Sequence, residues 1–222
     1  MDYGIVIEKI HQELKAYWGK GKVADYIPAL AGVEPKRYGI AIETLDGHSF
    51  QVGDADIRFS IQSISKVFAL AMVTRHLGDR IWKFVGREPS GNPFNSLVQL
   101  EYEHGIPRNP FINAGALVVT DRLMSLYEQP KDAILQFVRS ICGNDDIYYD
   151  KHIARSEREH ADRNMALGYL MKSFGNMEND VEDVVDVYCH QCAIAMNCKE
   201  LTRAFLFLAN HGVNPFNQEK IL

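Results

Sequence analysis

The sequence predicts a protein of mixed α/β class, in which a small portion built on a β-hairpin joins a larger, almost entirely helical portion. Residues 38–45 (YGIAIETL) are strand-like, Asp46-Gly47 is typical of a tight hairpin turn, and residues 49–52 can return as the second strand. Most of the chain from Ser63 to Asn210 instead has the pattern of helices separated by loops rich in Gly, Pro and Asn. A chain of 222 residues can bury a substantial core, as one domain or as two small ones.

The helices are predicted from apolar residues at helical spacing and from residues that begin or end helices. An opening helix is expected to end near Gly19 and Gly21, which makes the run 19–24 a loop and not a dinucleotide fingerprint. Ser156 and Glu159 have the spacing of a capping box, which predicts one helix from 156 to about 174. The other expected helices span residues 61–77, 114–119, 131–141, 181–196 and 199–210.

No segment after the hairpin is as strand-like as residues 38–52. An isolated two-stranded hairpin is marginally stable at best. The sheet is therefore expected to need strands that this chain does not contain.

Composition excludes several classes of function. The formal charge is −5 with acidic and basic residues interspersed, which does not fit binding to nucleic acid or to an anionic membrane surface. No apolar run approaches the length of a membrane span, and residues 1–4 (MDYG) lack the features of a signal peptide, so the cytoplasm is the expected location. The four cysteines are then expected to stay reduced: Cys142, Cys189, Cys192 and Cys198.

The segment with the clearest chemistry is Ser63-Ile64-Ser65-Lys66. Lys66 is the only formal charge between Phe59 and Val73, so its amine is expected to be buried, with a lowered pKa. A spacing of three places Ser63 and Lys66 on one face of a helix, where a neutral amine can activate a hydroxyl. With Ser60 as N-cap, Ser63 would fall in the first helical turn, where free N–H groups stabilise negative charge. The alternative is a surface turn with this spacing by chance.

Two further sets of residues have both a functional and a structural interpretation. Glu157 and Asn164 are seven apart on the expected helix, so they would share a face and could hold an amino-acid ligand. Alternatively, Glu157 complements the helix dipole and Asn113 is only an N-cap. Cys189 and Cys192 have the spacing of a metal or redox pair, but without a second pair they are interpreted as core thiols.

Taken together, these stretches resemble the serine-dependent glutaminases, relatives of the β-lactamases and penicillin-binding proteins. The chain also lacks the G-x-S-x-G and H-E-x-x-H motifs of other hydrolases. The matching segments occur in family order across nearly the whole chain: residues 23–28 (VADYIP), 59–68, 109–116 (NPFINAGA), 156–157 with 163–166 (RNMA), 188–192 (YCHQC) and 208–215 (LANHGVNP).

The resemblance implies a cytoplasmic homo-oligomer, dimer or tetramer, that hydrolyses L-glutamine to L-glutamate and ammonia without a metal or organic cofactor. Ser63 matches the nucleophile and Lys66 the base. The positions that match substrate-binding residues, the nucleophile included, are Tyr26, Gln62, Ser63, Asn113, Glu157, Asn164 and Tyr188.

The implied fold is a β-lactamase-like three-layer α/β sandwich with an all-helical subdomain. Residues 1–75 would form the N-terminal part of the α/β domain, 76–212 the helical domain, and 213–222 the return to the α/β domain. Members of this family continue beyond the position of Leu222 through a Lys-Ser-Gly-Val-type segment that supplies an oxyanion N–H and further strands. A catalytically inactive, amino-acid-binding form is therefore a second hypothesis, and a β-lactamase-like serine hydrolase is a third.

Overall fold

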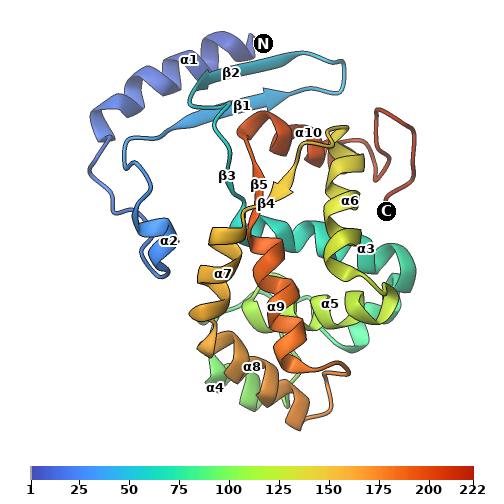
Figure 1. Cartoon of the computed structure of the whole chain (residues 1–222). Coiled ribbons are helices and arrows are strands. Elements are labelled where there is room, and N and C mark those ends of the chain that lie inside the picture. Colours follow the sequence, from blue (N-terminus) through green and yellow to red (C-terminus); the bar gives the residue numbers. More distant parts are fainter. Residues whose placement is uncertain (1) are drawn as a thin grey trace.

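The computed structural model describes residues 2–222 and has a hairpin-bearing upper part and a helical lower part (Figure 1). Met1, the first residue of the segment considered for a signal peptide, lies outside the described residues. Strands β1 (Gly39–Glu43) and β2 (Ser49–Gly53) form the predicted antiparallel hairpin, with Ala41 opposite Gln51. Helix α1 (Tyr3–Leu14) packs against β2, and α10 (Cys198–Ala209) packs against β1. The hairpin is therefore covered by two helices from opposite ends of the chain.

A second sheet, which the sequence did not predict, joins the two parts. It has the order β3 (Phe59–Ser60), β5 (Ile194–Met196), β4 (Tyr148–Tyr149), and both pairings are antiparallel. The prediction of one helix over 181–196 is wrong in its last turn, because α9 (Val181–Cys192) ends before β5. All three residues of β5 are buried, and a short strand that is apolar on both faces has no alternation to distinguish it from a helix.

The remaining helices follow the predicted order. The 3₁₀ turns are η1 (Lys15–Tyr17), η2 (Gln62–Ile64) and η3 (Gly78–Lys83), and the helices are α2 (Pro28–Ala31), α3 (Ser65–Leu77), α4 (Leu97–Tyr102), α5 (Asn113–Leu126), α6 (Pro130–Cys142), α7 (Lys151–Glu159) and α8 (Asp162–Ser173). Pro130 begins α6, and Gly143 ends it with a φ of +66°, a conformation that glycine adopts without strain. The prediction of this helix is confirmed.

The single helix expected from residue 156 to about 174 is instead two helices. Asp150 is the N-cap of α7 and accepts hydrogen bonds from the backbone N–H groups of His152 and Ile153, so Ser156 lies inside a helix that has already begun. The α7 helix ends at His160, whose ring nitrogen Nδ1 pairs with the Ser156 carbonyl oxygen at 2.9 Å. The capping-box pattern of Ser156 and Glu159 was therefore misleading.

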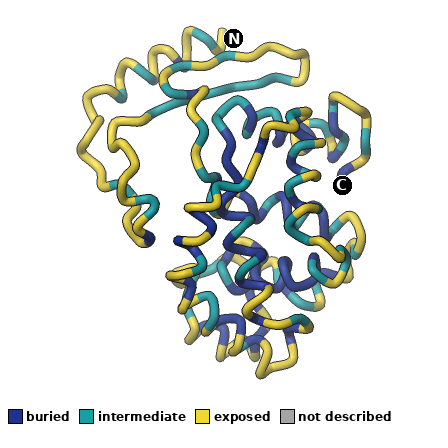
Figure 2. Tube along the Cα trace, viewed as in Figure 1, coloured by how far each residue is buried: buried dark blue, intermediate teal, exposed yellow. Residues whose placement is uncertain are grey.

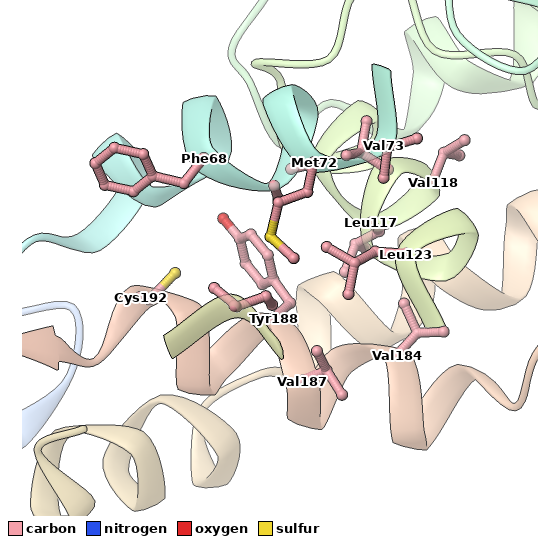
Figure 3. Packing of buried hydrophobic residues seen from close by; sticks show 14 of the residues in the cluster. Phe68, Met72, Val73, Leu117, Val118, Leu123, Val184, Val187, Tyr188 and Cys192 are labelled. Carbon is pink, nitrogen blue, oxygen red and sulfur yellow. The ribbon is translucent and has the colours of Figure 1, made fainter. Parts of the chain in front are cut away.

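The core lies where α3, α5 and α9 meet in the helical part (Figures 2 and 3). Met72 of α3 lies beside Tyr188 of α9, and Leu117 of α5 belongs to the same cluster. Gly115 allows the 109–110 segment to approach α5 closely, because a Cβ there would lie 1.9 Å from the Asn109 carbonyl oxygen. A small residue of α5 therefore permits the close approach of this segment. Within residues 2–222, no helix is both long enough and apolar enough to cross a membrane.

Candidate active site

Ser63 lies at the junction between strand β3 and helix α3. The prediction that Ser60 is the N-cap of this helix is wrong, since Ser60 is the last residue of β3 and α3 begins at Ser65. Ser63 belongs to the 3₁₀ turn η2, which leads directly into α3, so Lys66 follows Ser63 by about one helical turn. Ser63 is exposed whereas Lys66 is 4% exposed, so an accessible hydroxyl precedes a buried amine by one turn.

Lys66 is held by two oxygen atoms from the segment that leads into α5. Its Nζ donates to the Phe111 carbonyl oxygen at 2.9 Å and to Asn113 Oδ1 at 2.9 Å. Burial lowers the pKa of Lys66 to about 8. A neutral amine has two N–H groups and one lone pair, so these two acceptors can satisfy both N–H groups and leave the lone pair free to take a proton.

Asn113 connects Lys66 to the start of α8. The interpretation of Asn113 as an N-cap is wrong, because Ile112 is the N-cap of α5 and Asn113 is the first helical residue. Its Nδ2 donates to Asn164 Oδ1 at 3.3 Å while its Oδ1 accepts from Lys66. The Asn109 side chain fixes the preceding turn, because its Oδ1 accepts from the backbone N–H groups of Phe111 and Ile112.

Glu157 is a buried carboxylate in the last turn of α7, with 8% of its surface exposed. The alternative that it complements a helix N-terminus is wrong, since the C-terminal end of a helix disfavours negative charge. Burial raises the pKa of Glu157, and hydrogen bonds from Tyr26 and Gln62 oppose this effect. A carboxylate that is desolvated at an unfavourable helix end is suited to bind a cation.

Glu157 and Asn164 lie on α7 and α8 respectively, not on one helix face as predicted. Glu157 is linked to Tyr26 and Gln62, whereas Asn164 is linked through Asn113 to Lys66. The two residues therefore belong to two separate hydrogen-bonded groups.

Tyr26 reaches the site from the loop before α2. Its hydroxyl donates toward Gln62 Oε1 at 3.0 Å and Glu157 Oε1 at 3.1 Å, and desolvation with the Glu157 charge raises its pKa. Ile27 anchors the loop by packing with Ile153 and Ala154 of α7. The loop thus places Tyr26, which is distant in sequence, against the buried Glu157 carboxylate.

Tyr188 and Cys192 approach Ser63 from α9, and Figure 3 shows both side chains directed toward α3. Burial raises the pKa of Tyr188 well above its usual value, and the neighbouring Cys192 and Ser63 side chains also act on this pKa. Burial raises the pKa of Cys192 to about 12, and the Tyr188 and Ser65 side chains oppose this effect. The sequence analysis did not assign Cys192 or Ser65 to the site, although both lie in the segments that carried the resemblance.

Potential metal ligands do not gather at this site. Among residues 2–222, no group of three or more His, Cys, Asp or Glu side chains is arranged to hold a metal ion. Cys189 and Cys192 are unpaired, buried thiols, in agreement with their interpretation as core residues.

An accessible serine one turn before a buried lysine, on a mixed α/β fold, is the arrangement typical of serine hydrolases that use a lysine base. The family model named Glutaminase matches residues 21–222, and the chain belongs to this family. It is 56% identical over 222 residues to a glutaminase of Paraburkholderia phytofirmans, covering all of this chain and 73% of that protein.

Solved structures of the same family share the fold. A crystal structure of a probable glutaminase from Bacillus subtilis has a TM-score of 0.88 at 28% identity, covering 100% of this chain and 69% of that one. The glutamate form of Mglu has a TM-score of 0.86 at 33% identity, covering 95% of this chain and 48% of that one. The chain thus spans about half the length of Mglu. The predicted fold class, a β-lactamase-like α/β fold with helical additions, is confirmed.

Proposed function

We propose that the chain hydrolyses L-glutamine to L-glutamate and ammonia through an acyl-enzyme on Ser63, with Lys66 as the base. The observation that carries the mechanism is the buried Lys66 amine, with a pKa near 8, one turn after the exposed Ser63 hydroxyl. Membership of the glutaminase family supports the substrate, and the glutamate form of Mglu supports a site for the product. Release of ammonia from L-glutamine tests the activity directly.

The first half of the reaction forms the acyl-enzyme. Ser63 Oγ attacks the side-chain carbonyl carbon of glutamine while its proton moves to the neutral Lys66 amine. The Ser63 backbone N–H stabilises the resulting oxyanion. Collapse of this intermediate breaks the C–N bond, and the Lys66 ammonium gives its proton to the departing nitrogen, which leaves as ammonia.

The second half of the reaction restores Ser63. A water molecule attacks the ester carbonyl and gives a proton to the Lys66 amine. The bond between the carbonyl carbon and Ser63 Oγ then breaks, the Lys66 ammonium returns the proton to Ser63 Oγ, and glutamate leaves. Tyr188, whose pKa is affected by the Ser63 side chain, is placed to orient the Ser63 hydroxyl. Its raised pKa supports a role as a neutral hydrogen-bonding group at physiological pH.

The other residues of the site are proposed to hold the amino-acid end of glutamine. The Glu157 carboxylate accepts hydrogen bonds from the α-ammonium group of glutamine. Tyr26 donates to Glu157, and Gln62 lies beside both. Asn164 recognises the α-carboxylate, and Asn113 holds Asn164 in place while it also contacts Lys66. A positively charged group beside Glu157 would offset the desolvation of this carboxylate.

Replacing Glu157 with glutamine is expected to raise KM for glutamine by about 10- to 150-fold. This range corresponds to the roughly 1.5–3 kcal/mol contributed by a hydrogen bond to a charged group. Steady-state kinetics of ammonia release measure the effect, and Glu159→Gln, an exposed position of the same helix, is the matched control. An unchanged KM and kcat in Glu157→Gln would remove Glu157 from substrate binding.

The pH profile of kcat/KM is expected to rise about tenfold per pH unit below pH 8 and to level off above it. Only the neutral amine of Lys66 can take the Ser63 proton. Because its pKa is lowered to about 8, the deprotonation of Lys66 falls within the pH range of the assay. Initial rates from pH 6 to 9.5 measure the profile, with circular dichroism at each pH as the control for folding. A flat profile over this range would contradict a lysine base.

Two alternatives give different outcomes in the same assays. An inactive amino-acid-binding protein would bind L-glutamine in calorimetry without releasing ammonia. A β-lactamase-like hydrolase would cleave a chromogenic cephalosporin and leave glutamine intact. The family match over residues 21–222 favours the glutaminase.

We also propose that the protein is a cytoplasmic homo-oligomer and that its active site lies between two domains. The unpaired cysteines favour a reducing compartment. Exposed apolar side chains on α1 and α4, such as Ile5 and Val98, favour a dimer or tetramer. We retain the domains 1–75, 76–212 and 213–222, with the packing of α10 on β1 as a contact between the second and the first.

A further inference from the structure

The residue before the nucleophile has an unusual backbone conformation. Gln62 has a φ of +50°, in the left-handed region that residues with a Cβ adopt at a cost. Two of the other three such residues in the described chain, His104 and His211, directly follow the C-cap residue of a helix, where this conformation commonly ends the helix. Gln62 instead lies between a strand and a helix, where no helix ends.

The backbone on both sides of Gln62 is fixed. The N–H of Ile61, which is 1% exposed, donates to the Ile194 carbonyl oxygen at 2.9 Å and so continues the pairing of β3 with β5. The Gln62 carbonyl oxygen accepts from the Ser65 hydroxyl at 2.7 Å and from the Ser65 N–H. Ser65 is fully buried, so the sheet and the helix together hold the left-handed turn.

The Gln62 side chain is fixed as well. Its Nε2 donates to the Ser60 hydroxyl at 3.0 Å, and its Oε1 accepts from the Tyr26 hydroxyl at 3.0 Å. Strained residues persist only where the surroundings over-determine them, and they cluster at functional sites. Contacts from β3, β5, α3 and the Tyr26 loop therefore hold one unfavourable φ angle directly before Ser63.

We infer that Gln62 is a positioning residue, whose left-handed backbone turns the chain after β3 so that the Ser63 hydroxyl meets Tyr188 and lies one turn before Lys66. With a helical φ at residue 62, the chain after it would rotate by roughly 110° relative to β3. This role rests on the proposed function of Ser63 and is distinct from the contact of the Gln62 side chain with substrate.

Gln62→Gly and Gln62→Ala separate the backbone from the side chain. Both variants lose the same side-chain contacts, so both should raise KM equally, but only glycine adopts a positive φ without cost. We expect kcat of Gln62→Gly to exceed that of Gln62→Ala by about 5- to 30-fold, because the competent backbone is less populated in the alanine variant. Gln62→Asn should recover kcat relative to alanine, since asparagine tolerates this conformation.

Ile64 provides the matched control, because it is a half-exposed residue of the same turn with a helical φ of −62°. At this position alanine should give at least the kcat and thermal stability of glycine, the reverse of the order in kcat at residue 62. A Gly-to-Ala ratio of kcat below threefold at Gln62, or the same order at both positions, would overturn the inference.

A second measurement tests the positioning role of Gln62 independently of whether glutamine is the substrate. Phenylmethanesulfonyl fluoride transfers its sulfonyl group to a serine oxygen as fluoride leaves and the hydroxyl proton passes to a base. The rate of Ser63 sulfonylation, followed by intact mass, should keep the order Gly above Ala even if glutamine is not hydrolysed, a result that would reject only the substrate. Absence of reaction at Ser63 in the unsubstituted protein, or equal rates in both variants, would overturn the positioning role.

Discussion

Replacing Ser63 with alanine is expected to lower glutamine hydrolysis by at least about 10⁴-fold while leaving the fold intact. The hydroxyl forms the only proposed covalent bond to substrate, and removing a nucleophile leaves only binding and oxyanion stabilisation. The substitution removes one exposed oxygen atom, so the thermal unfolding midpoint should change little. Ammonia release and circular dichroism measure the two effects.

The control is Ser173→Ala, which removes a hydroxyl that is also exposed but lies at the end of α8. This variant should keep the turnover of the unsubstituted protein. Acid-quenched samples with glutamine should contain a glutamyl adduct on the Ser63 peptide, and Ser63→Ala should lack it. Ammonia release by Ser63→Ala at the unsubstituted rate would show that another group is the nucleophile.

Elements with a clear local signal were predictable from the sequence. The hairpin over 38–52 has an Asp-Gly turn between two strand-like runs, and α6 has a proline at its start and a glycine after its end. These signals are physical constraints on φ or on hydrogen bonding, so tertiary contacts rarely override them.

Strand β5 and the break between α7 and α8 were not predictable in this way. Residues 194–196 are apolar on both faces, so only pairing with β3 and β4 distinguishes them from another helical turn. The Ser156–Glu159 pattern of a capping box occurs inside α7, because Asp150 had already capped that helix six residues earlier. In both cases the deciding contact comes from outside the local window.

In the candidate site, too, local features were predictable from the sequence and long-range contacts were not. The burial of Lys66 was predictable, because it is the single charge in an apolar segment, and it is 4% exposed in the structure. The hydrogen bonds of Tyr26 to Gln62 and Glu157 were not predictable from spacing, because they join segments 36 and 131 residues apart. The strain at Gln62 is equally invisible in the sequence, where glutamine gives no signal for a positive φ.

Replacing Lys66 is the second change with a large expected effect, because the serine hydroxyl needs a base to become a nucleophile. We expect Lys66→Met to lower kcat by about as much as Ser63→Ala, since groups that act as a unit are not additive. Lys66→Arg separates basicity from charge, because the guanidinium keeps its proton at every accessible pH. Both variants should be inactive in ammonia release, and the double variant Ser63→Ala/Lys66→Met should be little worse than either.

The pH dependence of the free energy of unfolding reports on the Lys66 pKa and does not require an active enzyme. A lysine with a pKa of about 8 in the folded protein and near its usual value when unfolded binds fewer protons folded than unfolded, so stability rises with pH between these two values. Lys66→Met lacks this contribution. The free energy of unfolding of Lys66→Met minus that of the unsubstituted protein should therefore fall as pH rises from about 8 to 10. A difference that stays constant over this range would mean that the pKa of Lys66 is not lowered by folding, so that its amine would stay charged up to pH 10 and could not take the Ser63 proton.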